Sequence, residues 1–135
     1  MTRPFIDANV LIYAALQPDS RATVAREITS AGGQISVQVM NEFVAVARGK
    51  LKRSWPEIDY ALGLLRTLHP RPLPITLVTH RAAVEIAARY GLKIYDATII
   101  ASALEARCDT LFTEDMQDGQ VIEDRLTIRN PFLTH

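Results

Sequence analysis

The sequence predicts an α/β fold in which a short, mostly parallel central sheet is covered by helices on both faces. Short apolar runs alternate along the chain with segments whose apolar residues recur at helical spacing. The length of 135 residues is enough for one hydrophobic core. The composition, 48% hydrophobic and 22% charged, is ordinary for a globular protein. We therefore expect residues 1–135 to form a single domain.

Net charge and cysteine content restrict the class of protein. The 15 basic and 15 acidic residues cancel, so bulk attraction to nucleic acid is not expected. The one cysteine, Cys108, cannot form an internal disulfide, which fits a reducing compartment. No apolar run approaches the roughly 20 residues of a membrane span, and no signal-peptide pattern opens the chain. We expect a soluble, cytoplasmic protein with no membrane partner.

The first elements follow from apolar runs and turn residues. Phe5-Ile6 predicts a strand that ends at Asp7, and the apolar residues between 10 and 14 predict a helix after it. A second helix over 21–31 would be capped by Asp19 or Ser20 and stopped by two glycines. Residues 34–37 predict a second strand.

The middle of the chain predicts two helices and a strand. Apolar residues from Val39 onward recur at helical spacing up to Gly49. Ser54 precedes a helix that runs to about Leu68, with a proline near its first position. Residues 75–78 are a candidate strand.

The last part predicts two helices and the remaining strands. Thr79 would cap a helix over 81–90 that Gly91 closes, and Tyr95-Asp96 opens the next helix. Residues 110–112 form a clear strand. Two short runs, 121–122 and 126–128, are candidate edge strands.

Four acids follow the predicted strands or begin the helices after them: Asp7, Glu42, Asp96 and Asp115. Such positions converge at one edge of a right-handed parallel sheet, where ligands bind. Clustered carboxylates resist ionising together, and a divalent cation relieves their repulsion. An all-oxygen set suits Mg²⁺ or Mn²⁺, and such a site favours phosphoryl chemistry. We expect Asp7, Asp96 and Asp115 to be ligands and Glu42 to bind directly or through water.

Neighbouring polar residues have two interpretations each. Asn9 can hydrogen-bond the turn after Asp7 or simply cap a helix, and Thr113 can orient a carboxylate or simply end a strand. Asp118 can replace or supplement Asp115 at a metal site. Glu114 is expected to be solvated.

Four segments resemble the motifs of PIN-domain nucleases, in the family's order. They are Phe5 to Tyr13 with Asp-x-Asn, Ser36 to Phe43 with a helical Glu, Tyr95 to Ala103 with Asp, and Leu111 to Gly119 with Thr-x-Asp. The resemblance spans nearly the whole chain, and the VapC toxins are the subgroup that it is most similar to.

The resemblance implies a PIN-like three-layer α/β/α sandwich and an endoribonuclease that needs Mg²⁺ or Mn²⁺. It implies the ligand set Asp7, Glu42, Asp96 and Asp115 and an RNA substrate, a tRNA being one candidate. It also implies a homodimer and a cognate antitoxin, whose segment covers the cleft and can place a basic side chain among the acids.

A basic run lies just after the segment that carries Glu42: Arg48, Lys50, Lys52 and Arg53. It could grip RNA phosphates, with Trp55 stacking on an unpaired base. Alternatively, it is a solvated connection between helices, and Trp55 is a packed anchor.

Two other functions compete with a nuclease. A phosphohydrolase of small phosphate esters would use an Asp nucleophile after the first strand. It usually has a second Asp two residues later, where Asn9 stands, and a Lys on a later strand, which we do not find. A non-catalytic RNA-binding or scaffolding subunit would have no reason to bury a full set of acids.

Overall fold

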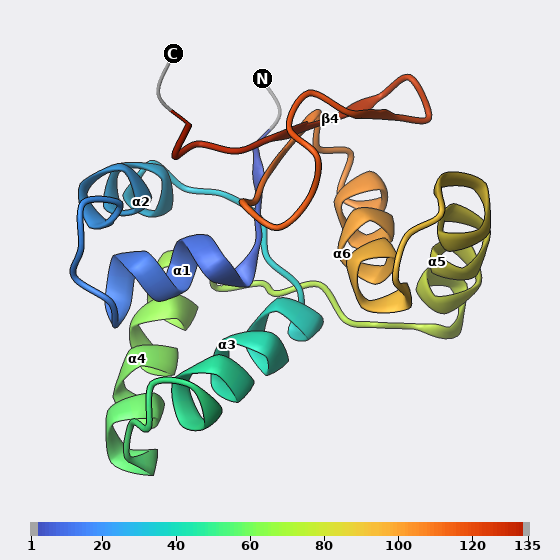
Figure 1. The fold of residues 1–135 in the computed structure, drawn as a ribbon. Helices are drawn as coiled ribbons and strands as arrows, with labels where there is room; N and C mark the ends of the chain where they lie inside the picture. The colour runs from blue at the N-terminus through green and yellow to red at the C-terminus, as the bar shows by residue number, and fades with distance from the viewer. Residues whose placement is uncertain (1–2, 134–135) are drawn as a thin grey trace.

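The computed structural model describes residues 3–133 (Figure 1). Along the chain the elements are β1 (Phe5–Ile6), α1 (Ala8–Ala15), α2 (Ala22–Ser30), α3 (Val37–Gly49), α4 (Trp55–Leu68), α5 (Leu77–Tyr90), α6 (Ile94–Glu105), β2 (Thr110–Phe112), β3 (Val121–Ile122) and β4 (Leu126–Arg129). None of the helices in this range is long and apolar enough to cross a membrane.

The four strands form one sheet in the order β1-β2-β4-β3. β1 pairs with β2 and β2 with β4 in parallel, whereas β3 pairs with β4 antiparallel. Figure 1 shows α1 and α2 on one side of the strands and α5 and α6 on the other. The predicted α/β class with a short, mostly parallel sheet is therefore confirmed. β4 is not an edge strand, because it lies between β2 and β3.

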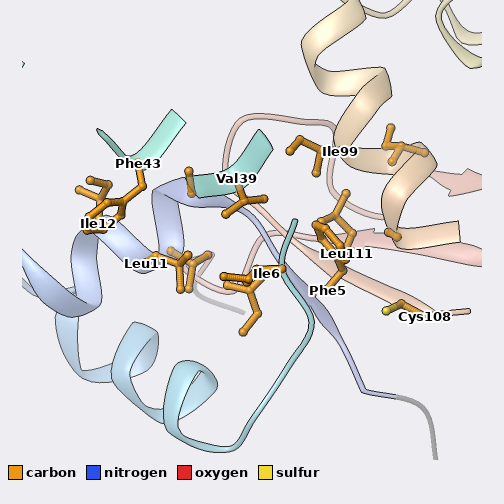
Figure 2. Packing of buried hydrophobic residues seen from close by; sticks show 14 of the residues in the cluster. Phe5, Ile6, Leu11, Ile12, Val39, Phe43, Ile99, Cys108 and Leu111 are labelled. Carbon is orange, nitrogen blue, oxygen red and sulfur yellow. The ribbon is translucent and has the colours of Figure 1, made fainter. Parts of the chain in front are cut away.

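Buried apolar side chains of the sheet and the helices form one core. Phe5 and Leu111 from neighbouring strands are fully buried, and Phe43 of α3 is buried in the same cluster (Figure 2). Cys108 lies at the margin of this core and is only 5% exposed. Burial raises the pKa of its thiol to about 11, so the thiol is protonated at neutral pH.

Side-chain caps explain where three helices begin. The Ser54 hydroxyl accepts the Glu57 backbone N–H while the Glu57 carboxylate accepts the Ser54 N–H, which forms a capping box. Ser36 caps α3 through the Val39 N–H. Thr76 caps α5, so the predicted cap Thr79 is wrong and lies instead at the third position of the helix. Gly91 ends that helix in the left-handed conformation with φ 66°.

Two predicted strands are wrong for the same physical reason. Residues 34–37 make only isolated parallel bridges, Phe5 with Gln34 and Ser36 with Leu73. Residues 75–78 form no strand, since α5 already begins at Leu77. In each case a side-chain hydroxyl within the run, that of Ser36 or Thr76, caps the following helix instead of lying in a strand. A short apolar run in the sequence does not distinguish a strand from a capped helix start.

The start of α2 also differs from expectation. Arg21 stands at the capping position just before α2 and makes no side-chain capping bond, so neither Asp19 nor Ser20 caps the helix. The Asp19 carboxylate instead accepts the Arg21 backbone N–H. The predicted stop is correct, because Gly32 adopts φ 92°.

Candidate active site

Asp7 connects β1 to α1 and is the most deeply buried acid of the predicted set. It is 4% exposed, and its two oxygens accept the Ala8 N–H at 2.7 Å and the Thr113 hydroxyl at 2.8 Å. Burial is the main cause that raises the pKa of Asp7 to about 6, and the charges of Asp115 and Asp96 add to it. The two hydrogen bonds oppose this rise without cancelling it.

The loop after β2 is tied to the first turn of α1 by side-chain hydrogen bonds. The Asn9 amide donates to the Thr113 hydroxyl at 3.1 Å and to the Asp115 carboxylate at 3.0 Å, while its carbonyl accepts the Glu114 N–H. The Thr113 hydroxyl also accepts the Asp115 N–H. Asn9 and Thr113 therefore fix two carboxylates relative to each other, although residues 9 and 115 are far apart in sequence.

Glu42 and Asp96 face the same cavity from α3 and α6. Burial and the charge of Asp7 raise the pKa of Glu42 to about 7. The pKa of Asp96 is also raised, first by burial and then by the charge of Asp115, while Lys93 opposes the rise. The negative charges of these acids therefore repel one another across the cavity, which raises their pKa values.

The cavity has a volume of about 330 Å³, and all four predicted acids line it. Lys50 of the basic run lies on its wall as well. Asp118 does not line it; the Asp118 carboxylate instead accepts the Asn130 backbone N–H.

Sequence reasoning missed a second group on the cavity wall. Glu114, expected to be solvated, is half-buried and accepts the Tyr13 hydroxyl at 2.6 Å, and the Arg21 guanidinium donates to the same hydroxyl. Burial and the Glu114 carboxylate raise the pKa of Tyr13 to about 12. The spacing of Tyr13 four residues after Asn9 could have indicated this position, because residues i and i+4 share a helix face.

The rest of the basic run has mixed environments. Arg48 lies over the Trp55 ring at 5.0 Å, and Arg53 donates to the Leu16 carbonyl and pairs with Glu57. Trp55 is 57% exposed, so its interpretation as a packed anchor is wrong. Lys50 and Lys52 are exposed.

The donor set suits a hard divalent cation. The four predicted carboxylates, that of Glu114 and the neutral amide of Asn9 line the cavity. No ion pair within residues 3–133 neutralises any of the four predicted acids, whereas Glu114 pairs with Arg21. In that same range no three carboxylate, imidazole or thiol groups lie close enough together to enclose an ion by themselves. Mg²⁺ usually takes only one or two protein carboxylates and completes its shell with water and phosphate oxygens, so this arrangement fits it.

Comparison with known proteins decides the family. The PIN domain family model matches residues 5–117, which is most of the chain. The chain belongs to the PIN-domain family. The match includes the first three motifs, the Thr-x-Asp of the fourth and all four predicted acids.

Solved structures confirm the PIN fold. A toxin–antitoxin complex from Klebsiella pneumoniae superposes with a TM-score of 0.71 at 23% identity, covering 96% of this chain and 98% of that one. Mycobacterium tuberculosis VapC20, a sarcin–ricin-loop-cleaving toxin, gives 0.67 at 18% identity over 83% and 91%. VapBC2 from Rickettsia felis, bound to a promoter DNA fragment, gives 0.61 at 19% identity over 94% and 97%. No curated protein matches this chain significantly by sequence.

Proposed function

We propose that this PIN-domain protein is a Mg²⁺- or Mn²⁺-dependent endoribonuclease that hydrolyses RNA phosphodiester bonds. The observation that carries the proposal is the convergence of Asp7, Glu42, Asp96 and Asp115 on one cavity, two of them with a pKa near neutrality. Clustered carboxylates whose pKa values are raised by burial and by one another's charge are typical of a metal-assisted phosphoryl-transfer site.

The residues of the cavity would have different roles. Asp7, Asp96 and Asp115 would hold the metal, and Glu42 would bind it directly or through water. The bound cation would supply a more acidic water and neutralise charge on the phosphate. Asn9 and Thr113 keep Asp7 and Asp115 in register, Lys50 offers a positive charge to the substrate, and a carboxylate not used as a ligand can accept the proton of the attacking water.

The rival functions have less support. Asn9 donates to Asp115 and Thr113, so its position is occupied by a structural amide rather than by the second acid that a small-ester phosphohydrolase needs. A non-catalytic RNA-binding subunit would gain nothing from carboxylates whose burial raises their pKa.

The direct test is to incubate the purified protein with structured RNAs, tRNA included, in Mg²⁺, in Mn²⁺ and in chelator. We expect cleavage only with a metal, and a loss of at least about 100-fold in Asp7→Asn and Asp96→Asn. Asp59→Asn is the matched control, because Asp59 is exposed on α4 and lies outside the cavity. Cleavage that persists in chelator or in both cavity variants would show that the site is wrong.

We further propose that the protein is the toxin of a type II toxin–antitoxin pair of the VapBC kind, acts in the cytoplasm and inhibits translation. Structural neighbours that are toxins or toxin–antitoxin complexes support this proposal. An antitoxin segment with an arginine among the four carboxylates would be held strongly and would exclude both metal and RNA. Co-expression with the product of an adjacent reading frame should give a stable complex without nuclease activity.

A homodimer is the proposed assembly. Leu77 and Val84 are seven residues apart, so they share a face of α5, and Leu77 and its neighbour Val78 are 63% and 69% exposed. Light scattering on the isolated protein should give twice the chain mass of 15.0 kDa.

A further inference from the structure

The carboxylates occupy only one end of the candidate active-site cavity. The cavity continues between α1 and α3, which pack against each other (Figure 1). The proposed metal chemistry assigns no role to most of the side chains there. We call this part of the cavity the α1–α3 groove, and it is lined by Ile12, Gln17, Ala45, Val46 and Lys50.

The groove reaches well beyond the carboxylates. Glu42 lies at its inner end on α3, and Lys50 lies at its outer end, just after the last residue of the same helix. A rise of 1.5 Å per residue places the backbones of these two residues about 12 Å apart. The cavity therefore has room for the group that is cleaved and for a neighbouring part of the same substrate.

The walls of the groove change from apolar to polar along its length. Ile12 contributes an apolar side chain from α1, and Ala45 and Val46 contribute apolar side chains from α3. Gln17 and Lys50 follow at the outer end and are the polar residues of the groove. A ligand that fits these walls has apolar faces and a hydrogen-bonding edge.

Gln17 provides both a donor and an acceptor at the edge of the groove. It is half-buried, so it is accessible from the cavity that it lines, and its side-chain amide makes no hydrogen bond within residues 3–133. Its backbone is fixed, because its N–H donates to the Ile12 carbonyl at 3.0 Å. The Arg53 guanidinium also donates to the neighbouring Leu16 carbonyl at 2.6 Å. The amide is thus held beside the groove and is free to bind a ligand.

We infer that the α1–α3 groove binds an unpaired nucleobase next to the scissile phosphate, and that the Gln17 amide recognises the edge of that base. A nucleobase has two apolar faces, which suit the walls from α1 and α3, and an edge of donors and acceptors that a Gln amide can match. A base within a duplex is already stacked and paired, so the groove selects single-stranded or looped RNA.

The two ends of the cavity support a base rather than a second phosphate in the groove. A phosphate would leave the apolar side chains of Ile12 and Val46 without a partner, whereas Lys50 at the outer end can meet the phosphate that follows the base. The inference rests on the proposed function, which supplies RNA as the substrate. It deepens that function by naming Gln17 as a residue that determines sequence specificity.

The experiment uses a pool of short, unstructured, random-sequence oligoribonucleotides and the full-length protein. Sequencing the ends produced in Mn²⁺ gives the base preference at each position beside the cleaved bond. We expect the wild type to prefer one base by about 10-fold at one such position, and Gln17→Ala to lower that preference to about twofold or less. Gln120→Ala is the matched control, because Gln120 is also half-buried but does not line the cavity.

The groove itself is tested with Ala45→Leu. Ala45 is exposed on α3, and leucine is a strong helix former, so the variant should fold while its larger side chain fills the groove. We expect KM for the RNA pool to rise by at least about fivefold. The increase in melting temperature with Mn²⁺ should remain, since the carboxylates are unchanged. Ala88→Leu, at an exposed position of α5, should match the wild type. An unchanged KM in Ala45→Leu would overturn the inference.

Binding in chelator separates this inference from the proposed function. We expect no cleavage there, and the RNA retained by the protein should show the same base preference, again lost in Gln17→Ala. If the wild type cleaves the pool but Gln17→Ala keeps its base preference, the inference fails and the proposed function stands. If the wild type cleaves nothing while the retained RNA shows a preference that depends on Gln17, the proposed function fails and the base-binding groove stands.

Discussion

Thr113 is the residue through which the candidate site is organised. Its hydroxyl is fully buried, donates to Asp7, and accepts from the Asn9 amide and the Asp115 backbone N–H. One oxygen atom thus connects the end of β1, the first turn of α1 and the loop after β2. Residues that orient carboxylates in this way affect activity nearly as strongly as the ligands do.

Replacing Thr113 by valine should lower kcat by about 10- to 100-fold, because Asp7 loses a donor and Asn9 loses an acceptor. Thr113→Ser keeps the hydroxyl and should stay within a few-fold of the wild type. Initial rates of RNA cleavage with Mn²⁺ measure the effect. A fully active Thr113→Val protein would show that the hydroxyl is structurally dispensable.

The buried charge of Asp7 should make the metal-free protein less stable above about pH 6 than at pH 4. The pKa of Asp7 is 3.8 when the chain is unfolded and about 6 when it is folded, so the folded protein retains a proton between these values. The free energy of unfolding then falls as pH rises from about 4 to 6 and stays low above that range. A shift of this size corresponds to about 3 kcal/mol at most.

Asp7→Asn removes the charge but weakens the contact with Thr113, so a net gain of about 1–2 kcal/mol is expected at pH 8 in chelator. The gain should shrink as pH falls from about 6 through 4, and the Asp7 carboxyl is protonated in both states only below about pH 3. Urea unfolding at several pH values measures it, with Asp59→Asn as the control for a surface acid. A gain that does not depend on pH would argue against a raised pKa.

Four of the five acids that line the cavity could be predicted from the sequence, whereas Glu114 could not be assigned to the wall. Asp7, Asp96 and Asp115 follow strands or begin helices, and the topology of a parallel sheet brings such positions together. The place of Glu114 depends on Tyr13 and Arg21, whose side chains meet it only after α1 and the loop after β2 have packed together. No pattern within one segment encodes that meeting.

At the scale of elements, the predictions succeeded where a cap and an apolar period agreed. The helix at 55–68 has Ser54, a proline and Glu57 at its start, and the structure confirms its bounds. The segments 34–37 and 75–78 had β-branched residues but also Ser36 and Thr76, and the capping hydrogen bonds determined the outcome. Local composition alone does not decide between these two competing interactions.

The capping box of α4 gives a test at this scale. Ser54→Ala removes the acceptor for the Glu57 N–H and should lower the free energy of unfolding by about 1 kcal/mol. Ser54→Asp provides another acceptor at the same position and should retain most of the stability. Chemical denaturation of the three proteins measures the difference; equal stability of Ser54→Ala and the wild type would mean that water replaces the cap.

For the whole molecule, a metal that bridges the cavity should stabilise the fold. The acids belong to β1–α1, α3, α6 and the loop after β2, so an ion held by several of them ties distant parts of the chain together. Binding only to the folded state stabilises it by about 2.7 kcal/mol at 100 times Kd.

Thermal unfolding should therefore shift to higher temperature with increasing Mn²⁺. The shift should be absent in Asp7→Asn and retained in Asp59→Asn. Ca²⁺ serves as a comparison ion, because it prefers more ligands at longer distances. An equal shift in Asp7→Asn would place the binding elsewhere.

The burial of Cys108 turns the only thiol of the chain into a reporter of unfolding. The side chain is 5% exposed and its pKa is about 11, so an alkylating reagent cannot react with it until the structure around β2 opens. Each molecule can take up a single thiol label. Intact-mass spectrometry would therefore measure the fraction of molecules that have opened at least once. The rate of labelling would then follow how often the native fold opens under native conditions, without denaturant and without any knowledge of its substrate.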